Sequence, residues 1–119
     1  MEMRDKYGSL RLLDHGEVSK TRVSFNRKEL ALILGIYGRM VALGEWRDYG
    51  ISMLKDFSVF SIYRHASEHP IYRVKKTAKK LNKPEVFSII LMDGKILKRG
   101  HDLSIVLRAL ETKLIRGVK

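Results

Sequence analysis

The chain has 119 residues and a mass of 13.8 kDa, a size typical of one domain. Its 24 lysines and arginines outnumber 13 acidic residues, which gives a net charge of +11, and its 45% hydrophobic content is too high for a charged disordered chain. The lack of cysteine excludes a disulfide scaffold, cysteine-ligated zinc, iron–sulfur clusters and a thiol nucleophile. No run resembles a signal peptide or a membrane span, so we expect a cytoplasmic protein without membrane association.

The first part of the chain differs in pattern from the rest. Residues 1–17 mix charges with two glycines and have no sustained hydrophobic period, so we expect a weakly ordered N-terminal segment. We expect a single domain over residues 18–119, which is long enough to bury one hydrophobic core.

The best-marked predicted element is a helix over about residues 26–43. Asn26 and Glu29 have the spacing of a capping box, and Gly44 is suited to end the helix. The helix is apolar nearly all round, and one side is a stripe of small residues: Ala31, Gly35, Gly38 and Ala42. Such a helix needs cover on several sides, so we expect a buried central helix. Either the fold itself encloses the helix, or a second subunit completes its burial in a homodimer.

Arg39 is the only charged residue within this helix between residues 30 and 43. An unpaired charge on a buried helix is costly, so we expect a carboxylate nearby. The connection that follows contains Glu45 and Asp48. Either carboxylate could neutralise Arg39, and we expect a structural ion pair between Arg39 and Asp48.

From residue 51 the hydrophobic period changes to two, which is typical of β-strands. Strand patterns occupy residues 57–64, 71–75, 86–92 and 95–99. Asp93-Gly94 between the last two predicts a hairpin with a type I′ turn, whose two central residues both need positive φ. A narrow apolar stripe after Asp102 predicts an amphipathic C-terminal helix over about residues 102–115. We therefore expect an α+β fold with an antiparallel sheet of three to five strands.

The excess positive charge is concentrated in residues 64–100, which hold ten basic and three acidic residues. A local excess of this kind attracts anionic partners, although it is also compatible with a solvated lysine-rich surface. The candidate contacts for such a partner are Arg64, Arg73, Lys75, Lys98, Arg99 and His101. DNA or RNA is the favoured partner, and an acidic protein is the alternative. The strand aromatics Phe60, Tyr72 and Phe87 could stack on bases, but we expect them in the core.

The segment Lys98–Asp102 has two interpretations. In the first it is an anion-binding site, because two bases and a histidine precede a predicted helix N-terminus, where free N–H groups and the helix dipole favour anions. Alternatively, Asp102 caps its own helix, and Lys98 and Arg99 simply alternate across a strand. The sequence pattern is compatible with both interpretations.

One motif has the order found in a class of zinc peptidases, H-x-x-E-H, formed by His65, Glu68 and His69. Pro70 disfavours helical geometry at His69, so a loop explains the motif better. The G-x-x-G at residues 35–38 lies inside a capped helix and indicates packing, and no phosphate-binding loop motif is present. We expect no catalytic residue, no metal and no cofactor.

Three segments together resemble a family of small alphaproteobacterial proteins, domain of unknown function 2794: residues 27–51, 60–74 and 96–110. The most specific parts are Tyr37-Gly38-Arg39, Gly44-Glu45-Trp46-Arg47-Asp48-Tyr49 and Leu97-Lys98-Arg99-Gly100-His101-Asp102-Leu103. The resemblance spans about residues 23–115 and implies a bacterial cytoplasmic protein with no assigned activity. In the family pattern the position of His65 is commonly arginine, which argues against zinc. The same pattern suits an arginine-rich anion surface at Arg64 and Arg73.

We therefore expect a non-catalytic module that binds an anionic partner through residues 64–101. The alternative is a homo-oligomeric adaptor or regulator, built around helix 26–43, with no nucleic-acid partner. The third and least favoured interpretation is a small zinc hydrolase.

Overall fold

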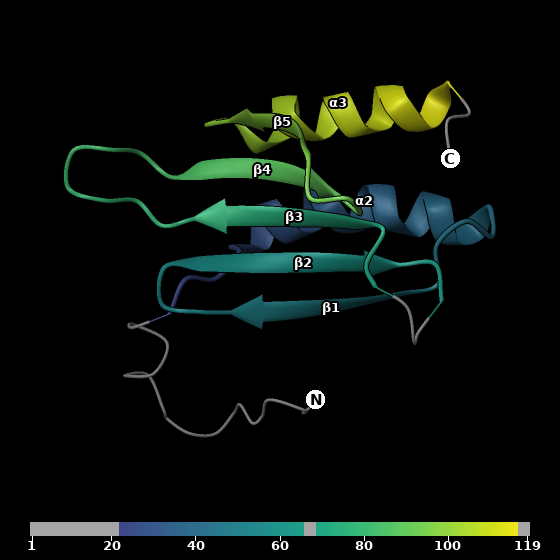
Figure 1. The fold of residues 1–119 in the computed structure, drawn as a ribbon, viewed down its shortest axis with the longest axis horizontal. Helices are drawn as coiled ribbons and strands as arrows, with labels where there is room; N and C mark the ends of the chain where they lie inside the picture. Colours follow the sequence, from purple (N-terminus) through teal and green to yellow (C-terminus); the bar gives the residue numbers. More distant parts are fainter. Residues whose placement is uncertain (1–21, 66–68, 117–119) are drawn as a thin grey trace.

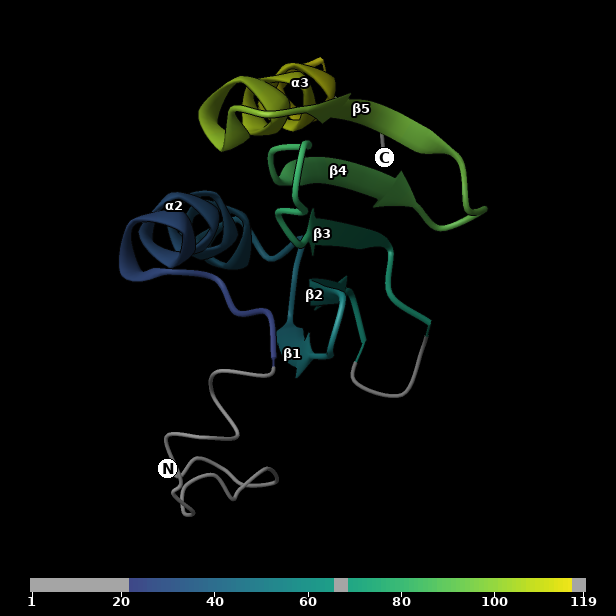
Figure 2. The ribbon, with the colours of Figure 1, turned by 90° about the vertical axis from the view of Figure 1, so that its left-hand side faces the viewer.

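The computed structural model describes residues 22–65 and 69–116, so the expected N-terminal segment 1–17 lies outside the described residues. The elements in chain order are α2 (Arg27–Ala42), β1 (Asp48–Met53), β2 (Phe57–Tyr63), β3 (Tyr72–Thr77), β4 (Val86–Leu91), β5 (Ile96–Gly100) and α3 (Leu103–Ile115). The strands form one antiparallel sheet in the order β1-β2-β3-β4-β5, and both helices lie on the same side of it (Figures 1 and 2). The predicted α+β fold is confirmed.

The sheet has an inner face toward the helices and an open face away from them. In β2 and β3 every second residue is buried, as expected for strands with one covered face. The register aligns the buried residues across strands, so that Val74 lies between Phe60 and Ile89. The largest fully buried side chains of the core are Phe60, Ile33, Ile62, Ile89, Leu110, Val74 and Val106. Within the described part of the chain, no helix or strand packs on the open face.

Helix α2 begins with the predicted capping box. The Glu29 N–H donates to Asn26 Oδ1, and the Asn26 N–H donates to Glu29 Oε1, both at 2.8 Å. Only one side of the helix is buried, through Glu29, Ile33 and Ile36. The small-residue stripe on the other side is exposed, and a Cβ atom added to either of its glycines would meet nothing within 4 Å. The helix is thus half-covered rather than enclosed as we expected, because the sheet and α3 reach only one side.

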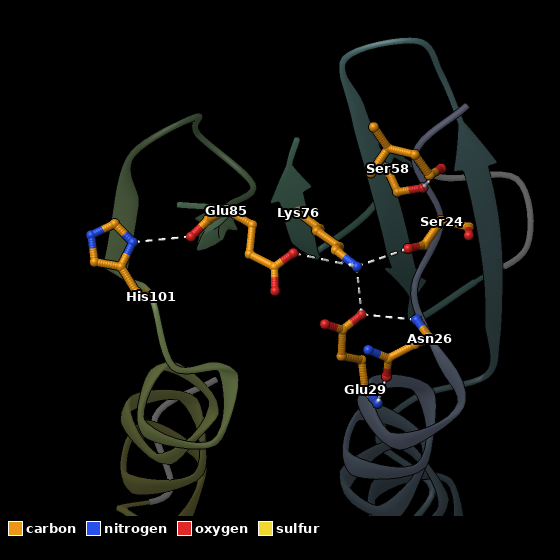
Figure 3. A network of polar contacts seen from close by, with 8 residues as sticks. Ser24, Asn26, Glu29, Ser58, Lys76, Glu85 and His101 are labelled. Carbon is orange, nitrogen blue, oxygen red and sulfur yellow. Dashed lines mark hydrogen bonds and ion pairs between the residues drawn. The ribbon is translucent and has the colours of Figure 1, made fainter. Parts of the chain in front are cut away.

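A buried ionic network joins the start of α2 to the inner face of the sheet (Figure 3). The Lys76 Nζ, on β3, donates hydrogen bonds to the Ser24 carbonyl and to Glu29 Oε1, both at 2.9 Å. Glu85 Oε1 lies 3.8 Å from the same nitrogen. Lys76 is only 9% exposed, so this charge is removed from water and held by its partners. The network fixes the entry of α2 onto the sheet.

The hairpin between β4 and β5 is confirmed, but its turn is not the predicted type I′. Gly94 has a φ of +91°, whereas Asp93 has no positive φ. The Gly94 N–H donates to the Leu91 carbonyl at 2.9 Å, and the Lys95 N–H donates to Asp93 Oδ1 at 3.0 Å. A turn followed by one left-handed glycine is typical of a three-residue hairpin loop. Asp93 therefore holds the turn through its side chain rather than through a left-handed backbone.

Candidate functional site

Three of the six candidate anion contacts lie together on the open face of the sheet. Arg73 and Lys75 alternate with the buried residues of β3, and Arg99 lies on β5. Ser88 pairs with both Lys75 and Arg99, so these three residues form a row across the sheet. Standard strand spacings put the Lys75 Cα about 7 Å from that of Arg73 and about 10 Å from that of Arg99. The three basic side chains therefore share one local surface.

The same face also carries half-buried apolar and aromatic side chains: Phe57, Val59, Tyr63, Val86 and Ile90. The Lys75 Nζ lies 4.5 Å from the centre of the Phe57 ring, a cation–π contact that holds the ammonium group against the sheet. Among the described strand positions of this face, the only acidic residue is Asp48, the first residue of β1. The face thus combines a positive potential with a broad, partly apolar floor.

The other three candidate contacts lie elsewhere. Lys98 pairs with Ile89, an inner-face residue, so its side chain leaves the sheet on the opposite side from that of Arg99. Arg64 follows the end of β2 and lines a cavity on the helix side. The His101 Nδ1 lies 3.0 Å from the Glu85 carbonyl (Figure 3). The six residues therefore do not form a single site.

The N-terminus of α3 is capped by its own chain. Asp102 Oδ1 accepts hydrogen bonds from the Ser104 N–H at 3.0 Å and from the Ser104 hydroxyl at 2.7 Å. The hydroxyl bond is the main reason that the pKa of Asp102 lies below its ordinary value. Because a carboxylate already occupies this terminus, the capping interpretation of the segment Lys98–Asp102 is the one that the geometry favours. Gly100 serves packing, since a Cβ atom there would lie 3.3 Å from Val106 Cγ2.

The ion pair predicted between Arg39 and Asp48 is wrong. Arg39 pairs with Glu111 of α3, 72 positions further along the chain. Asp48 instead accepts a hydrogen bond from the Tyr49 N–H at 2.8 Å. The partner of Arg39 depends on how α3 packs beside α2, which no local spacing reveals.

The three strand aromatics lie in the core, as expected. Phe60, Tyr72 and Phe87 are all at most 6% exposed and face the helices. Tyr49 on β1 stacks on Phe60 with ring centres 4.8 Å apart, and Tyr37 of α2 meets Tyr49 edge to face at 5.0 Å. Burial, followed by the charge of the nearby Asp48, raises the pKa of Tyr37. The contacts of Tyr37 with Tyr49 and Phe60 join α2 to the sheet. The three buried strand aromatics are not free to stack on bases.

A cavity of about 330 Å³ lies between the C-terminal halves of the two helices and the adjoining ends of β2 and β3. Its lining is mostly apolar and includes Ile36, Trp46 and Tyr72, while Arg64 and Glu45 supply charge. The lining comes from several separate segments of the chain, so no sequence motif marked it.

The candidate zinc motif is only partly within the described residues. His65 and His69 are both exposed, and Glu68 lies outside the described residues. Within residues 22–65 and 69–116, no three His, Cys, Asp or Glu side chains are grouped so that they could hold a metal ion. Nor does either described helix have the length and apolar character needed to cross a membrane.

The fold and its surfaces define a small α+β domain whose sheet is covered by helices on one face and bears a basic surface on the other. The family described as a protein of unknown function, DUF2794, matches residues 23–107, which include the whole sheet. The chain belongs to this family, so the resemblance is confirmed. No curated protein and no solved structure matches the chain.

Proposed function

We propose that the protein is a non-catalytic cytoplasmic module that binds single-stranded nucleic acid on the open face of its sheet. The observation that carries the proposal is the shared surface of Arg73, Lys75 and Arg99, which lies beside half-buried aromatic residues. Basic groups that follow a backbone, combined with aromatic rings that contact bases, are the usual means of binding single strands. The major groove of DNA admits a helix or a two-stranded ribbon, and this face spans five strands, which favours single strands over duplexes.

The three basic residues of the open face have the same role in this mechanism. Arg73, Lys75 and Arg99 neutralise phosphates and release bound counterions, which supplies most of the binding free energy at low salt. Tyr63 offers ring surface to bases at one side of the basic row, and Phe57 holds the Lys75 ammonium group through its cation–π contact. Phosphate contacts carry no sequence information, so we expect weak sequence preference.

The test is fluorescence anisotropy with labelled single-stranded DNA, single-stranded RNA and duplex DNA over a series of salt concentrations. The variant Arg73→Gln/Lys75→Gln/Arg99→Gln removes the open-face charge. The variant Arg27→Gln/Lys28→Gln/Arg108→Gln removes equal charge from exposed positions on the helices and is the matched control.

We expect wild type and the control to bind single strands with an affinity that falls steeply with salt. The open-face variant should bind weakly, and its slope of log K against log salt should be smaller by about 2, since each single-strand phosphate contact contributes about 0.7. Equal loss in both variants would mean that only net charge matters. No binding of wild type to any oligonucleotide at low salt contradicts the proposal and favours an acidic protein as the partner.

A second candidate function is self-assembly of two copies through the outer side of α2, as in an adaptor or regulator. This side exposes Leu34, Val41 and Leu43, the last at 71%, beside the small-residue stripe. The charge of Arg39 is compensated by Glu111, and the other two basic residues of this helix, Arg27 and Lys28, are both in its first turn, away from the stripe's C-terminal half. Two glycines inside a helix cost about 1 kcal/mol each relative to alanine, and a closely packed second helix would offset that cost.

Light scattering during size exclusion tests this candidate. A dimer at micromolar concentration that Gly38→Gln converts to monomer supports it, since a Cβ atom added there meets nothing within 4 Å and the variant can fold. Ile105→Gln, at an exposed position of α3, is the control and should leave the mass unchanged. A monomer at all concentrations contradicts the candidate.

A further inference from the structure

The cavity between the two helices and the adjoining ends of β2 and β3 lies on the other side of the sheet from the basic open face. Its volume of about 330 Å³ is at the lower end of the range in which small-molecule sites fall, about 300–1,000 Å³. The floor is apolar and includes Ile36, Met40 and Ile71. An occupant with an apolar body therefore gains free energy by burial here.

Two buried aromatic side chains with polar groups line this cavity. Tyr72 is 6% exposed and Trp46 is 4% exposed, and their ring centres are 5.9 Å apart. Among the residues that the structure describes, neither the Tyr72 hydroxyl nor the Trp46 indole N–H has a hydrogen-bond partner. Buried groups of these two kinds normally have one. A hydrogen-bond acceptor on an occupant would supply the missing partner.

Arg64 adds positive charge beside Tyr72. Both residues line the same cavity. Burial raises the pKa of Tyr72, and the positive charge of Arg64 counteracts part of that effect. The hydroxyl, the indole N–H and the guanidinium can all donate hydrogen bonds. Three donors, one of them charged, select an acceptor that carries negative charge.

Two carboxylates in the lining limit how much charge the occupant can carry. They belong to Glu45 and to the Arg39–Glu111 ion pair, and they oppose a multiply charged anion such as a phosphate chain. Leu43 and Ile115, also in the lining, are 71% and 84% exposed. An apolar tail that covers these two side chains removes exposed apolar surface from water.

We propose that this cavity binds a small carboxylic acid with an apolar body. The carboxylate accepts hydrogen bonds from Tyr72, Arg64 and the Trp46 indole N–H, and the body packs on the apolar floor. The open face of the sheet takes no part, so this site is independent of the proposed nucleic-acid function.

The probe is octanoate, with 1-octanol as its neutral analogue of equal chain length. Trp46 is the only tryptophan of the chain, so its fluorescence reports directly on the cavity. We expect octanoate to change the Trp46 emission in a saturable way and to release heat in calorimetry. 1-Octanol should bind at least about tenfold more weakly, because it lacks the charged acceptor.

Two variants assign the carboxylate contacts. Tyr72→Phe keeps the ring and removes the hydroxyl, and Arg64→Gln removes the charge at an exposed position. Each should weaken octanoate binding by about tenfold and 1-octanol binding by less, because the octanol hydroxyl is a neutral and weaker acceptor. Lys98→Gln removes the same charge at another exposed position outside the cavity, and it should change neither affinity.

Three results would each overturn the proposal. They are no fluorescence or heat signal at millimolar octanoate, equal affinity for octanoate and 1-octanol, and wild-type octanoate affinity in both variants. Thermal unfolding followed by circular dichroism checks that Tyr72→Phe folds. If it does not fold, Arg64→Gln alone decides, because an exposed side chain is not needed for the core.

Discussion

Replacing Lys76 by methionine removes the central charge of the buried network at the start of α2. The Nζ of Lys76 binds the Ser24 carbonyl and Glu29 Oε1, each at 2.9 Å. Its own side chain is 11% exposed and that of Glu29 is 10% exposed, so water reaches neither group well. The variant therefore leaves a buried carboxylate without its counter-charge.

The cost follows from this burial. Removing one partner of a buried ion pair destabilises a protein by about 3–5 kcal/mol. For a domain of this size each kcal/mol lowers the melting temperature by about 4–8 °C, so we expect a fall of roughly 12 °C or more. Glu85, at 3.8 Å and with a 40% exposed side chain, is too far away and too well hydrated to add much.

Thermal and urea unfolding measure the effect, and Lys75→Met is the matched control. Lys75 is the preceding residue of the same strand but lies on the open face, where its cation–π contact with Phe57 is worth about 0.5–1 kcal/mol. The double variant Lys76→Met/Glu29→Gln should be more stable than Lys76→Met alone. Glutamine removes the buried carboxylate charge of Glu29 that has lost its partner, and its side-chain oxygen can still accept the capping-box hydrogen bond.

Two results would refute this reasoning. One is a destabilisation by Lys76→Met no larger than that by Lys75→Met. The other is a double variant that is less stable than Lys76→Met alone. That result would mean that the unpaired Glu29 carboxylate does not destabilise the protein when Lys76 is lost.

Three further substitutions test the N-cap of α3 and two glycines. Hydrogen bonds from Ser104 lower the pKa of Asp102 in the folded state, so its stabilisation is complete above the unfolded value of about 3.8 and is lost as pH falls through the folded value. Urea unfolding near neutral pH and at about pH 3 should thus show a smaller pH effect for Asp102→Asn than for wild type, and an equal effect contradicts the cap. Gly100→Ala should cost about 1 kcal/mol in the same assay, because the fully buried Val106 must shift, and unchanged stability would mean that the contact relaxes freely. Gly35→Ala should stabilise the monomer by about 0.5–1 kcal/mol, since a Cβ there meets nothing, and a loss of stability would reveal an unseen contact.

The elements of the fold were predictable because their signals are local. The capping box of Asn26 and Glu29 and the N-cap at Asp102 each involve residues a few positions apart. The alternation of β2 and β3 likewise follows from neighbouring residues. Element types and order therefore agree with the pattern of the chain except at β1, which begins at Asp48 within the predicted connection and was not among the predicted strands.

The buried ionic contacts were not predictable in the same way. Lys76 occupies an inner-face position where alternation alone predicts an apolar residue. Its partner Glu29 is 47 positions away in the sequence, and Arg39 pairs with Glu111, which is 72 positions away. Both pairs depend on the packing of helices against the sheet and against each other, which the chain pattern does not contain.

The candidate anion surface was predictable in part. Alternation alone puts Arg73 and Lys75 on one face of β3, but the addition of Arg99 and the loss of Lys98 depend on the register between β4 and β5. That register shifts once between Ile89 and Ile90, so no count of positions along the chain settles it. The cavity was missed altogether because its lining is assembled from distant segments.

The most direct test of the central claim is to map nucleic-acid binding onto the two sides of the molecule. Amide ¹H–¹⁵N spectra are recorded while unlabelled single-stranded RNA or DNA is added at low salt. Binding on the open face predicts the largest shifts in the β3, β4 and β5 residues around Arg73, Lys75, Ser88 and Arg99, with little change in α2. Shifts confined to the two helices, or no shifts at all, would contradict it.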